Sequence, residues 1–578
     1  MNFIIKIFFI ISILVGLNIS AQNKDIRASL KKENLMVYDS INVEIRKDVT
    51  VTLSLVLNPL NKETKNTILI NTIYADVNNV ALGKSFAKEG YAVVVLNTRG
   101  KYLSGNVLDP FEHEAEDIHE VINWITKQEW SNGKVGMLGH SYSGFSAWAA
   151  TKKLHPALKT IISQAAVGPG VDFPMRNNIF FTYTLSWLNR VTNNKMTDNA
   201  DFNNWKKWNA VYKRWYESGV SFSKLDSVSG KTNVGFQRWL DHPSYDDYWK
   251  SMVPYKDDFA KINIPVLTTT GYYDADQLGA LYYLNEHTFY NKNAEHYLII
   301  GPYDHQGVEG AIKSNLRGYT IDPVAKINFN KIYLEWFNYI FKNDDKPEAL
   351  KNKINYQLMG SNEWRSKASL SDFEHQKMKW YLNHKNGQFL LLTKPDRKNF
   401  STLTVDLKDR TDANELLNLK YNIVDNEIYR KNNLIYTTEP FDKDIDFSGR
   451  FSGELTFSVN KKDVDLYFSL FEKTADNKYI LLSSCVTRAS YAKNREQRSL
   501  LIPGKKESIP INNSEFVSKR IPKGSSLMVM VGVNKSPFWQ INYGTGGDVS
   551  NETLKDAYEP VDLRIFGNTY IELPLDFN

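Results

Sequence analysis

One serine stands where an apolar segment would turn sharply into a helix. Residues 134–144 read KVGMLGHSYSG, with small residues on both sides of Ser141. A serine on a strand-to-helix turn is exposed at the carboxyl edge of a sheet, and the free N–H groups of the helix face whatever is bonded to it. The string is G-x-S-x-x-G, in which Ser143 stands where G-x-S-x-G has its second glycine. Ser143 would already lie inside the helix, so we predict that Ser141 is a nucleophile; the alternative is a serine that only caps the helix.

A serine hydroxyl attacks a carbonyl carbon only when an imidazole removes its proton and a carboxylate orients that imidazole. Two later segments offer these groups. The short predicted strand 265–270 is followed by Asp274, and the short predicted strand 296–300 is followed by His305. Each group comes just past the carboxyl end of a predicted strand, on the edge that carries Ser141. The order serine, aspartate, histidine along the chain is the order of the α/β-hydrolase fold.

Other residues near these positions offer the same chemical groups. Asp276 could take the place of Asp274, and Asp304 could be a local partner of His305. Loop aspartates usually form turns, so the agreement of order, edge and spacing is what favours Asp274. His140 is excluded as the base because a residue adjacent to the serine in such a turn points elsewhere.

The elements that must position these groups follow from the hydrophobic pattern. Up to residue 172 short apolar runs alternate with helical spacings, which predicts a parallel sheet covered on both faces. Aromatic residues then recur at helical spacing, and after about residue 354 short β-rich segments separated by turns indicate a sandwich or jelly roll. We therefore expect an α/β domain with a helical cap insertion, followed by a β-sandwich (jelly-roll) domain. The expected boundaries are 22–172 and 259–350 for the α/β domain, 173–258 for the cap and 351–578 for the β-sandwich.

The N-terminus has the pattern of a secretory signal peptide. Lys6 supplies a positive charge, residues 7–17 are apolar, and Ala21 is a small residue before a cleavage point. The apolar run is little more than half of the about 20 residues that span a membrane. We expect a signal peptide at 1–21, a secreted or periplasmic mature protein and no stable membrane insertion.

The composition argues against several classes of function. The chain has 578 residues, and its 71 basic and 65 acidic side chains leave a net charge of +6 without a basic run, which predicts no nucleic-acid partner. The single cysteine, Cys485, cannot form an intrachain disulfide. Because ten histidines occur without an HExxH motif or paired cysteines, we expect neither a metal nor an organic cofactor.

These pieces together resemble the family of cocaine esterases, α-amino-acid ester hydrolases and X-prolyl dipeptidyl-peptidases. The similarity extends from about residue 41 nearly to the C-terminus and includes the jelly roll. Besides the serine turn, its landmarks are NTRG at 97–100, HPSYDDYW at 242–249, GYYD at 271–274 and GPYDH at 301–305. Asn97 departs from the aspartate that is usual in the family.

The resemblance implies roles for particular residues. It assigns the catalytic triad to the serine, aspartate and histidine already singled out. It also implies an oxyanion hole made by the backbone N–H of Tyr142 and a tyrosine hydroxyl, which by position is that of Tyr74. In the amino-acid ester hydrolases, acidic residues near the triad hold the α-ammonium group of the substrate. Asp276 resembles one of them, whereas Gln277 is neutral where a further acid would be expected.

The leading hypothesis is hydrolysis of an ester, amide or peptide bond through an acyl-enzyme. A narrower alternative is an X-Pro dipeptidyl exopeptidase or an α-amino-acid ester hydrolase. A third hypothesis, from another class, is a glycan-binding protein whose jelly roll acts and whose triad is inert. The sequence leaves homo-oligomerisation open.

Overall fold

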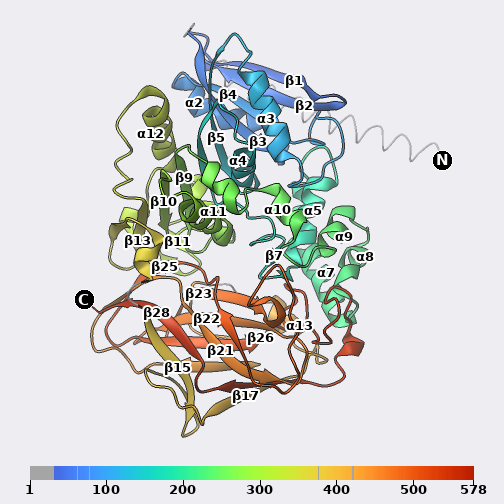
Figure 1. Cartoon of the computed structure of the whole chain (residues 1–578), viewed down its shortest axis with the longest axis vertical. Coiled ribbons are helices and arrows are strands. Elements are labelled where there is room, and N and C mark those ends of the chain that lie inside the picture. The colour runs from blue at the N-terminus through green and yellow to red at the C-terminus, as the bar shows by residue number, and fades with distance from the viewer. Residues whose placement is uncertain (1–31, 61–62, 77, 375–376, 420–421, 578) are drawn as a thin grey trace, which may run out of the picture.

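The computed structural model describes residues 32–577 apart from 61–62, 77, 375–376 and 420–421. The predicted signal peptide lies outside these described residues. Among them, no helix has the length and apolar character needed to cross a membrane. An α/β part and a β part lie one above the other, with a helical region along one side (Figure 1).

The α/β part is built on a ten-stranded sheet of order β1-β2-β4-β3-β5-β6-β9-β10-β13-β14. All pairs from β4 to β13 are parallel, whereas β1, β2 and β14 pair antiparallel at the two edges. Every residue of β4, β9 and β10 is buried, as expected for strands covered on both faces. The strands are β1 (Met36–Arg46), β2 (Val49–Leu57), β3 (Lys65–Thr72), β4 (Ala92–Asn97), β5 (Ser131–His140), β6 (Leu158–Gln164), β9 (Val266–Gly271), β10 (His296–Gly301), β13 (Ile354–Leu358) and β14 (Glu363–Lys367).

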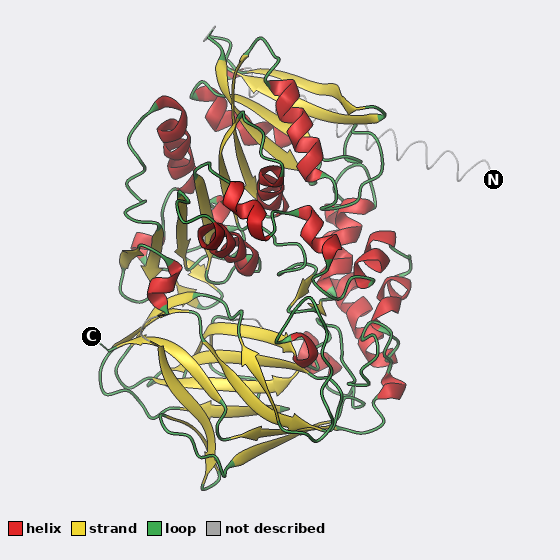
Figure 2. Cartoon of the chain, viewed as in Figure 1, coloured by secondary structure: helices red, strands yellow, loops and turns green. Residues whose placement is uncertain are grey.

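Helices on both sides of this sheet connect its parallel strands (Figure 2). Trp148 of α4 stacks on Tyr283 of α11, with ring centroids 4.7 Å apart and the rings 8° from parallel. This contact ties the helix that follows the serine turn to the helix that follows the aspartate loop. The helices are α2 (Lys84–Lys88), α3 (Glu114–Ile125), α4 (Tyr142–Lys152), α11 (Gln277–Tyr290) and α12 (Phe329–Lys342).

A helical region lies between β6 and β9, in the segment where the aromatic spacing predicts a cap. It begins with a short ribbon of β7 (Met175–Arg176) and β8 (Ile179–Phe180). Its large aromatic side chains, including Trp208, Trp239 and Trp249, are buried and form its core. The helices are α5 (Tyr183–Thr192), α6 (Asn199–Phe202), α7 (Trp205–Ser218), α8 (Leu225–Ser229), α9 (Val234–Leu240) and α10 (Asp247–Met252).

The C-terminal part is a β domain, as predicted, whose strand pairs are antiparallel except for β16 with β19. The strict jelly-roll topology stays a prediction. The described strands are β15 (Lys377–Lys385), β16 (Gln388–Leu392), β17 (Phe400–Val405), β18 (Val424–Asp425), β19 (Asn433–Thr437), β20 (Ile445–Gly449), β21 (Ser452–Val459), β22 (Asp465–Lys473), β23 (Tyr479–Arg488), β24 (Glu507–Ile511), β25 (Val517–Ile521), β26 (Ser526–Val533), β27 (Val561–Phe566) and β28 (Tyr570–Asp576).

Two buried polar contacts fasten the β domain to the segments that carry the candidate site. The Gln277 side chain donates to the carbonyl of Phe516 at 2.9 Å and accepts from its amide at 2.6 Å, which fixes the first turn of α11. Arg488 forms a two-pronged ion pair with Asp465 and donates to the carbonyl of Asn178 at 2.8 Å. The β domain therefore lies against the start of α11 and the β7–β8 turn, beside the carboxyl edge of the sheet.

Candidate active site

Ser141 lies on a strained turn between β5 and α4, as the motif predicts. Its φ and ψ are 61° and −121°, a region that non-glycine residues rarely adopt. Small neighbours are required because a Cβ on Gly139 would come within 2.0 Å of the Ser143 carbonyl oxygen, and one on Gly144 within 2.8 Å of the Gln164 carbonyl oxygen. The steric crowding at this bend explains the glycines on both sides of the serine.

Asp274 and His305 lie together at the carboxyl ends of β9 and β10. His305 Nδ1 and Asp274 Oδ1 are 2.8 Å apart. The Asp274 carboxylate is buried and also accepts from the Thr270 hydroxyl at 2.8 Å and the Asp276 amide at 3.0 Å. Burial disfavours its charged form, but the charge of His305 and these hydrogen bonds outweigh that effect and lower the pKa of Asp274. The aspartate is thus held as an anion beside the imidazole.

His305 also contacts the serine turn. Its backbone carbonyl lies 2.7 Å from Nε2 of His140, and the two imidazole rings are 4.4 Å apart between centroids. In the described residues no hydrogen bond joins the Ser141 hydroxyl to the His305 ring; catalytic hydrogen bonds often tighten only when substrate is bound. The structure therefore brings two members of the predicted triad into direct contact and places the third on the adjoining turn.

The alternative carboxylates differ in their partners. Asp304 accepts from Lys313 Nζ at 2.6 Å and from the Gly307 amide at 2.9 Å, so its oxygens are already engaged. Asp276 Oδ2 lies 3.6 Å from His305 Nδ1, farther away than Asp274. The geometry thus favours Asp274 as the group that orients His305.

Both tyrosines implied as oxyanion donors are next to Ser141. The Tyr74 hydroxyl accepts from Trp187 Nε1 at 3.0 Å. Burial raises the pKa of Tyr74, and Ser141 lies near enough to oppose that shift in part. The Tyr142 hydroxyl donates to Glu114 and accepts from the Phe111 amide at 3.1 Å. The Tyr142 amide is in the first turn of α4, where N–H groups have no acceptor within the helix.

Several carboxylates lie near His305 and the start of α11. Asp172 is buried and accepts from the amides of Gly168 and Gly279, so it lies against the start of α11 close to Asp276. Burial, together with the charge of Asp274, raises the pKa of Asp276 to about 6. Burial alone would lower the pKa of His305, but the charges of Asp276 and Asp274 raise it to about 9.

The described residues hold two groups whose ligand atoms are close enough together for a metal ion. One is the Asp274, Asp276 and His305 group, in which Asp274 is already occupied by the hydrogen bonds described above. The other consists of Asp109, Glu112 and His113, and Arg238 donates to both of its carboxylates. The guanidinium of Arg238 thus already takes the place that a metal ion would have between these carboxylates.

Three residues of the site were not singled out from the sequence: Trp187, Glu114 and Asp172. Trp187 lies in α5, within the segment where the sequence indicates only recurring aromatic residues. Glu114 begins α3, and burial raises its pKa to about 7. Asp172 lies at the expected boundary of the cap. Only contacts between segments far apart in the sequence show that these three side chains belong to the candidate site.

Comparisons with known proteins agree with this fold. Residues 38–307 match the sequence model of the X-Pro dipeptidyl-peptidase (S15 family), and residues 348–555 match that of the X-Pro dipeptidyl-peptidase C-terminal non-catalytic domain. The chain is 23% identical over 525 residues to the cocaine esterase of Rhodococcus sp. (strain MB1 Bresler), covering 82% of this chain and 86% of the esterase.

Two solved structures share the fold over nearly the whole chain. An α-amino acid ester hydrolase superimposes with a TM-score of 0.78 and 18% identity, covering 94% of this chain and 97% of the other. An aminopeptidase from a marine sediment Thaumarchaeota archaeon gives a TM-score of 0.77 and 18% identity, covering 93% and 96%. The predicted α/β-hydrolase fold followed by a β domain is confirmed. The chain belongs to the X-Pro dipeptidyl-peptidase (S15) family and is a serine hydrolase of the group that acts on ester or peptide bonds.

Proposed function

We propose that this protein hydrolyses esters and amides of acyl groups that carry a free α-amino group, with Ser141 as the nucleophile. His305 takes the proton from the Ser141 hydroxyl, and Asp274 holds the imidazole in the tautomer that can accept it. The serine oxygen bonds to the carbonyl carbon, and His305 then passes the proton to the leaving alcohol or amine. Water, activated by the same imidazole, releases the acid from the acyl-enzyme.

The oxyanion of the tetrahedral intermediate is stabilised by the Tyr74 hydroxyl and the Tyr142 amide. A phenol has one proton to donate. Because the indole N–H of Trp187 donates to the Tyr74 oxygen, the proton of that hydroxyl is left to point toward the Ser141 side. Burial raises the pKa of Tyr74, so the hydroxyl keeps this proton at neutral pH. Trp187 is therefore a positioning residue for the oxyanion donor.

The preference for a free α-amino group is supported by one observation, the Asp276 carboxylate 3.6 Å from the triad histidine. Asp172 adds a second carboxyl group close by, and both would gain from an ammonium ion placed between them and the scissile carbonyl. This arrangement fits an amino-acid ester or the N-terminal residue of a peptide. Release of an X-Pro dipeptide is the second candidate, favoured by the match to the family of dipeptidyl-peptidases.

The mature protein is proposed to be secreted or periplasmic. Support for this comes from the sequence alone, from the charge of Lys6 and the apolar run at 7–17.

A substrate panel on protein lacking residues 1–21 tests the proposed function. We expect alanine methyl ester to be hydrolysed at least ten times more efficiently than N-acetyl-alanine methyl ester, because acetylation removes the charge that Asp276 binds. Ser141→Ala should abolish turnover and Ser143→Ala should retain it. Equal rates for the free and acetylated esters would refute the amino-group preference, and faster release from an Ala-Pro anilide would favour the dipeptidase.

The role of Trp187 can be tested with a double-mutant cycle. We expect Trp187→Phe to lower kcat about tenfold with little change in KM, because loss of the indole N–H frees the Tyr74 proton to turn away from the oxyanion. Removing an oxyanion donor altogether costs about 10²–10³ in kcat, which is the effect expected of Tyr74→Phe.

In a Tyr74→Phe background, Trp187→Phe should have no further effect on kcat. Trp205→Phe, at an exposed cap tryptophan, is the matched control. Additive losses in the double variant would show that Trp187 acts through packing alone and not through Tyr74.

The raised pKa of His305 predicts that kcat/KM increases with pH in the alkaline range. Only the neutral imidazole accepts the serine proton, so kcat/KM should rise from pH 7 toward a midpoint near 9. Asp276→Asn removes a negative charge that favours the imidazolium, and the midpoint should therefore move to lower pH. Asp304→Asn, on the same loop but bound to Lys313, should leave the midpoint unchanged. A midpoint that does not move in Asp276→Asn would contradict this electrostatic account.

A further inference from the structure

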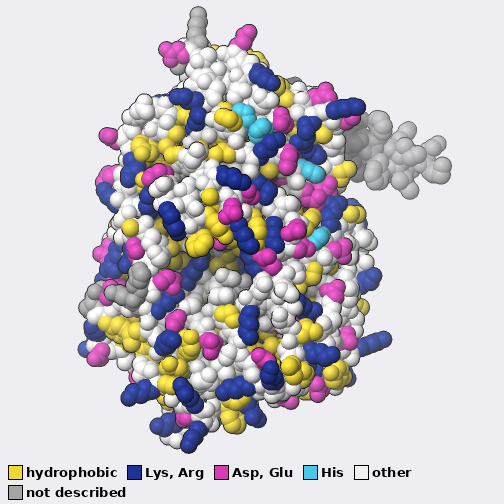
Figure 3. Space-filling model, in the orientation of Figure 1, with side chains coloured by type: hydrophobic (Ala, Val, Ile, Leu, Met, Phe, Trp, Pro, Cys, Tyr) yellow, Lys and Arg dark blue, Asp and Glu magenta, His cyan; other side chains and the backbone are white. Residues whose placement is uncertain are grey.

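A cleft of about 150 Å³ lies between α11, the loop before β7 and the β domain. Leu278, Tyr282 and Glu286 are spaced four residues apart and line it from one face of α11. Asp276, beside His305, stands at the residue just before this same helix, without a side-chain capping bond. Val171 of the lining precedes Asp172, and Leu278 lies in the first turn of α11, so the cleft lies near the candidate site although no residue of the triad lines it. In Figure 3 the visible face is hollowed where the α/β and β parts meet, and Lys and Arg side chains lie around the hollow.

Arg450, from the turn between β20 and β21, lines the cleft without a counter-ion. No carboxylate among the described residues forms an ion pair with it, although the charge of Glu374 acts to raise its pKa. Enclosure by the protein lowers the pKa of Arg450 to about 10. A partly enclosed guanidinium without a partner loses part of its hydration, and an anion bound against it would offset that loss.

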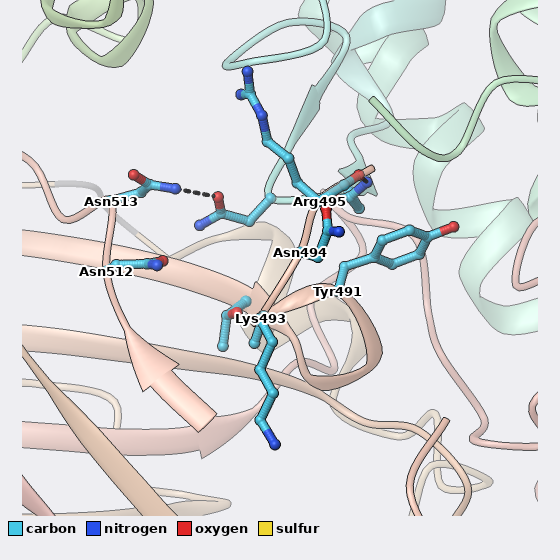
Figure 4. Close-up of a pocket in the computed structure, with 10 residues that line it drawn as sticks. Tyr491, Lys493, Asn494, Arg495, Asn512 and Asn513 are labelled. Atoms are coloured by element: carbon cyan, nitrogen blue, oxygen red, sulfur yellow. Dashed lines mark hydrogen bonds between the residues drawn. The ribbon is translucent and has the colours of Figure 1, made fainter. Parts of the chain in front are cut away.

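Arg495 presents a second guanidinium to the cleft. It stacks 3.6 Å above the ring centroid of Tyr245 and 5.2 Å from that of Tyr282, which fixes its plane. Stacking leaves the N–H groups at the guanidinium edge free to donate to a carboxylate. Figure 4 shows a smaller adjoining cavity that shares Arg495 and Asn513 with the cleft; there Arg495 extends away from the β strands, whereas Lys493 extends the opposite way.

Glu286 also lines the cleft, and its negative charge must be counted against the charges of Arg450 and Arg495. Glu286 is partly buried, which raises its pKa, and Arg495 is the nearest positive charge acting on it. Glu286 therefore offsets Arg495, and the charge of Arg450 is left uncompensated. A single uncompensated charge matches a monoanion, such as a carboxylate, better than a dianion.

We propose that this cleft binds a carboxylate carried by the substrate at a distance from the scissile bond, with Arg450 as its main partner and Arg495 as a second donor. Its volume is similar to that of a cavity of roughly 150 Å³ that admits benzene, enough for a carboxyl group and a few methylenes. The link to catalysis rests on the proposed function. The substrates would be acidic amino-acid esters or short peptides with an acidic residue near the cleaved bond.

Two matched substrate pairs separate the sources of the carboxylate. The first pair, glutamate α-methyl ester and glutamine methyl ester, tests a carboxylate on the acyl group. The second pair, alanyl-glutamate amide and alanyl-glutamine amide, tests a carboxylate on the leaving group. In one pair the acidic member should have a KM at least ten times lower. Arg450→Gln should remove that difference, Arg450→Lys should restore part of it, and Arg397→Gln, at an exposed loop of the β domain, should leave it intact. Equal KM values within both pairs, or a difference that survives Arg450→Gln, would overturn the proposal.

A binding measurement separates this inference from the proposed function. Glutarate and glutaramide are titrated calorimetrically into Ser141→Ala protein, which needs no turnover. Glutarate should bind at least ten times more tightly than glutaramide, and Arg450→Gln should abolish the preference. If glutarate binds in this way while no ester or peptide is cleaved by the wild type, the proposed function fails and the carboxylate site stands. If both compounds bind equally, the carboxylate site fails whatever the activity.

Discussion

The bend between β5 and α4 is the constraint on which the site depends. It holds Ser141 at a positive φ, and that conformation persists only because the flanking glycines let strand, helix and neighbouring loop approach within contact distance. The strain places the hydroxyl at the carboxyl edge of the sheet and aims the first N–H groups of α4 at it. Because β5, β9 and β10 all run parallel, their ends deliver the serine turn, the aspartate loop and the histidine loop to one edge.

The charges near His305 are a second constraint on the site, because they set the protonation state of the imidazole. In the proposed mechanism, buried carboxylates beside His305 would stabilise the imidazolium that forms when Ser141 is deprotonated. They also raise the pKa of His305, so its side chain is protonated near neutral pH when no substrate is bound. An ammonium group on the substrate would neutralise part of that field. The same carboxylates would therefore select the substrate and bring the base into its working protonation state once the substrate is bound.

The sequence predicts those parts of the fold in which local pattern and burial agree. The strands β4 and β10 are mostly apolar and β9 is rich in β-branched residues, as expected when both faces are covered, and the polar residues after β9 and β10 stand out as strand-end groups. The aromatic spacing between residues 173 and 258 likewise predicts helices where α5 to α10 occur. In each case the pattern that reveals the element is a regular spacing of residue types within a short stretch of sequence.

The rest depends on contacts between remote segments. Trp187 and Tyr74 are 113 residues apart, and no spacing in the sequence indicates that an indole from the cap donates to that hydroxyl. Asp172 lies 107 residues before Gly279, whose amide it binds. No sequence pattern singles out Arg450. It is notable only because no carboxylate among the described residues pairs with it. Such features follow from packing of the three parts and not from local propensity.

A crystal structure of the protein after reaction with a fluorophosphonate would test the central geometric claim most directly. The account predicts a phosphorus atom bonded to Ser141 Oγ, with one phosphonyl oxygen within hydrogen-bonding distance of both the Tyr74 hydroxyl and the Tyr142 amide. His305 should lie within reach of Ser141 Oγ while still bonded to Asp274. An adduct on another residue, or a His305 ring remote from the modified serine, would contradict it.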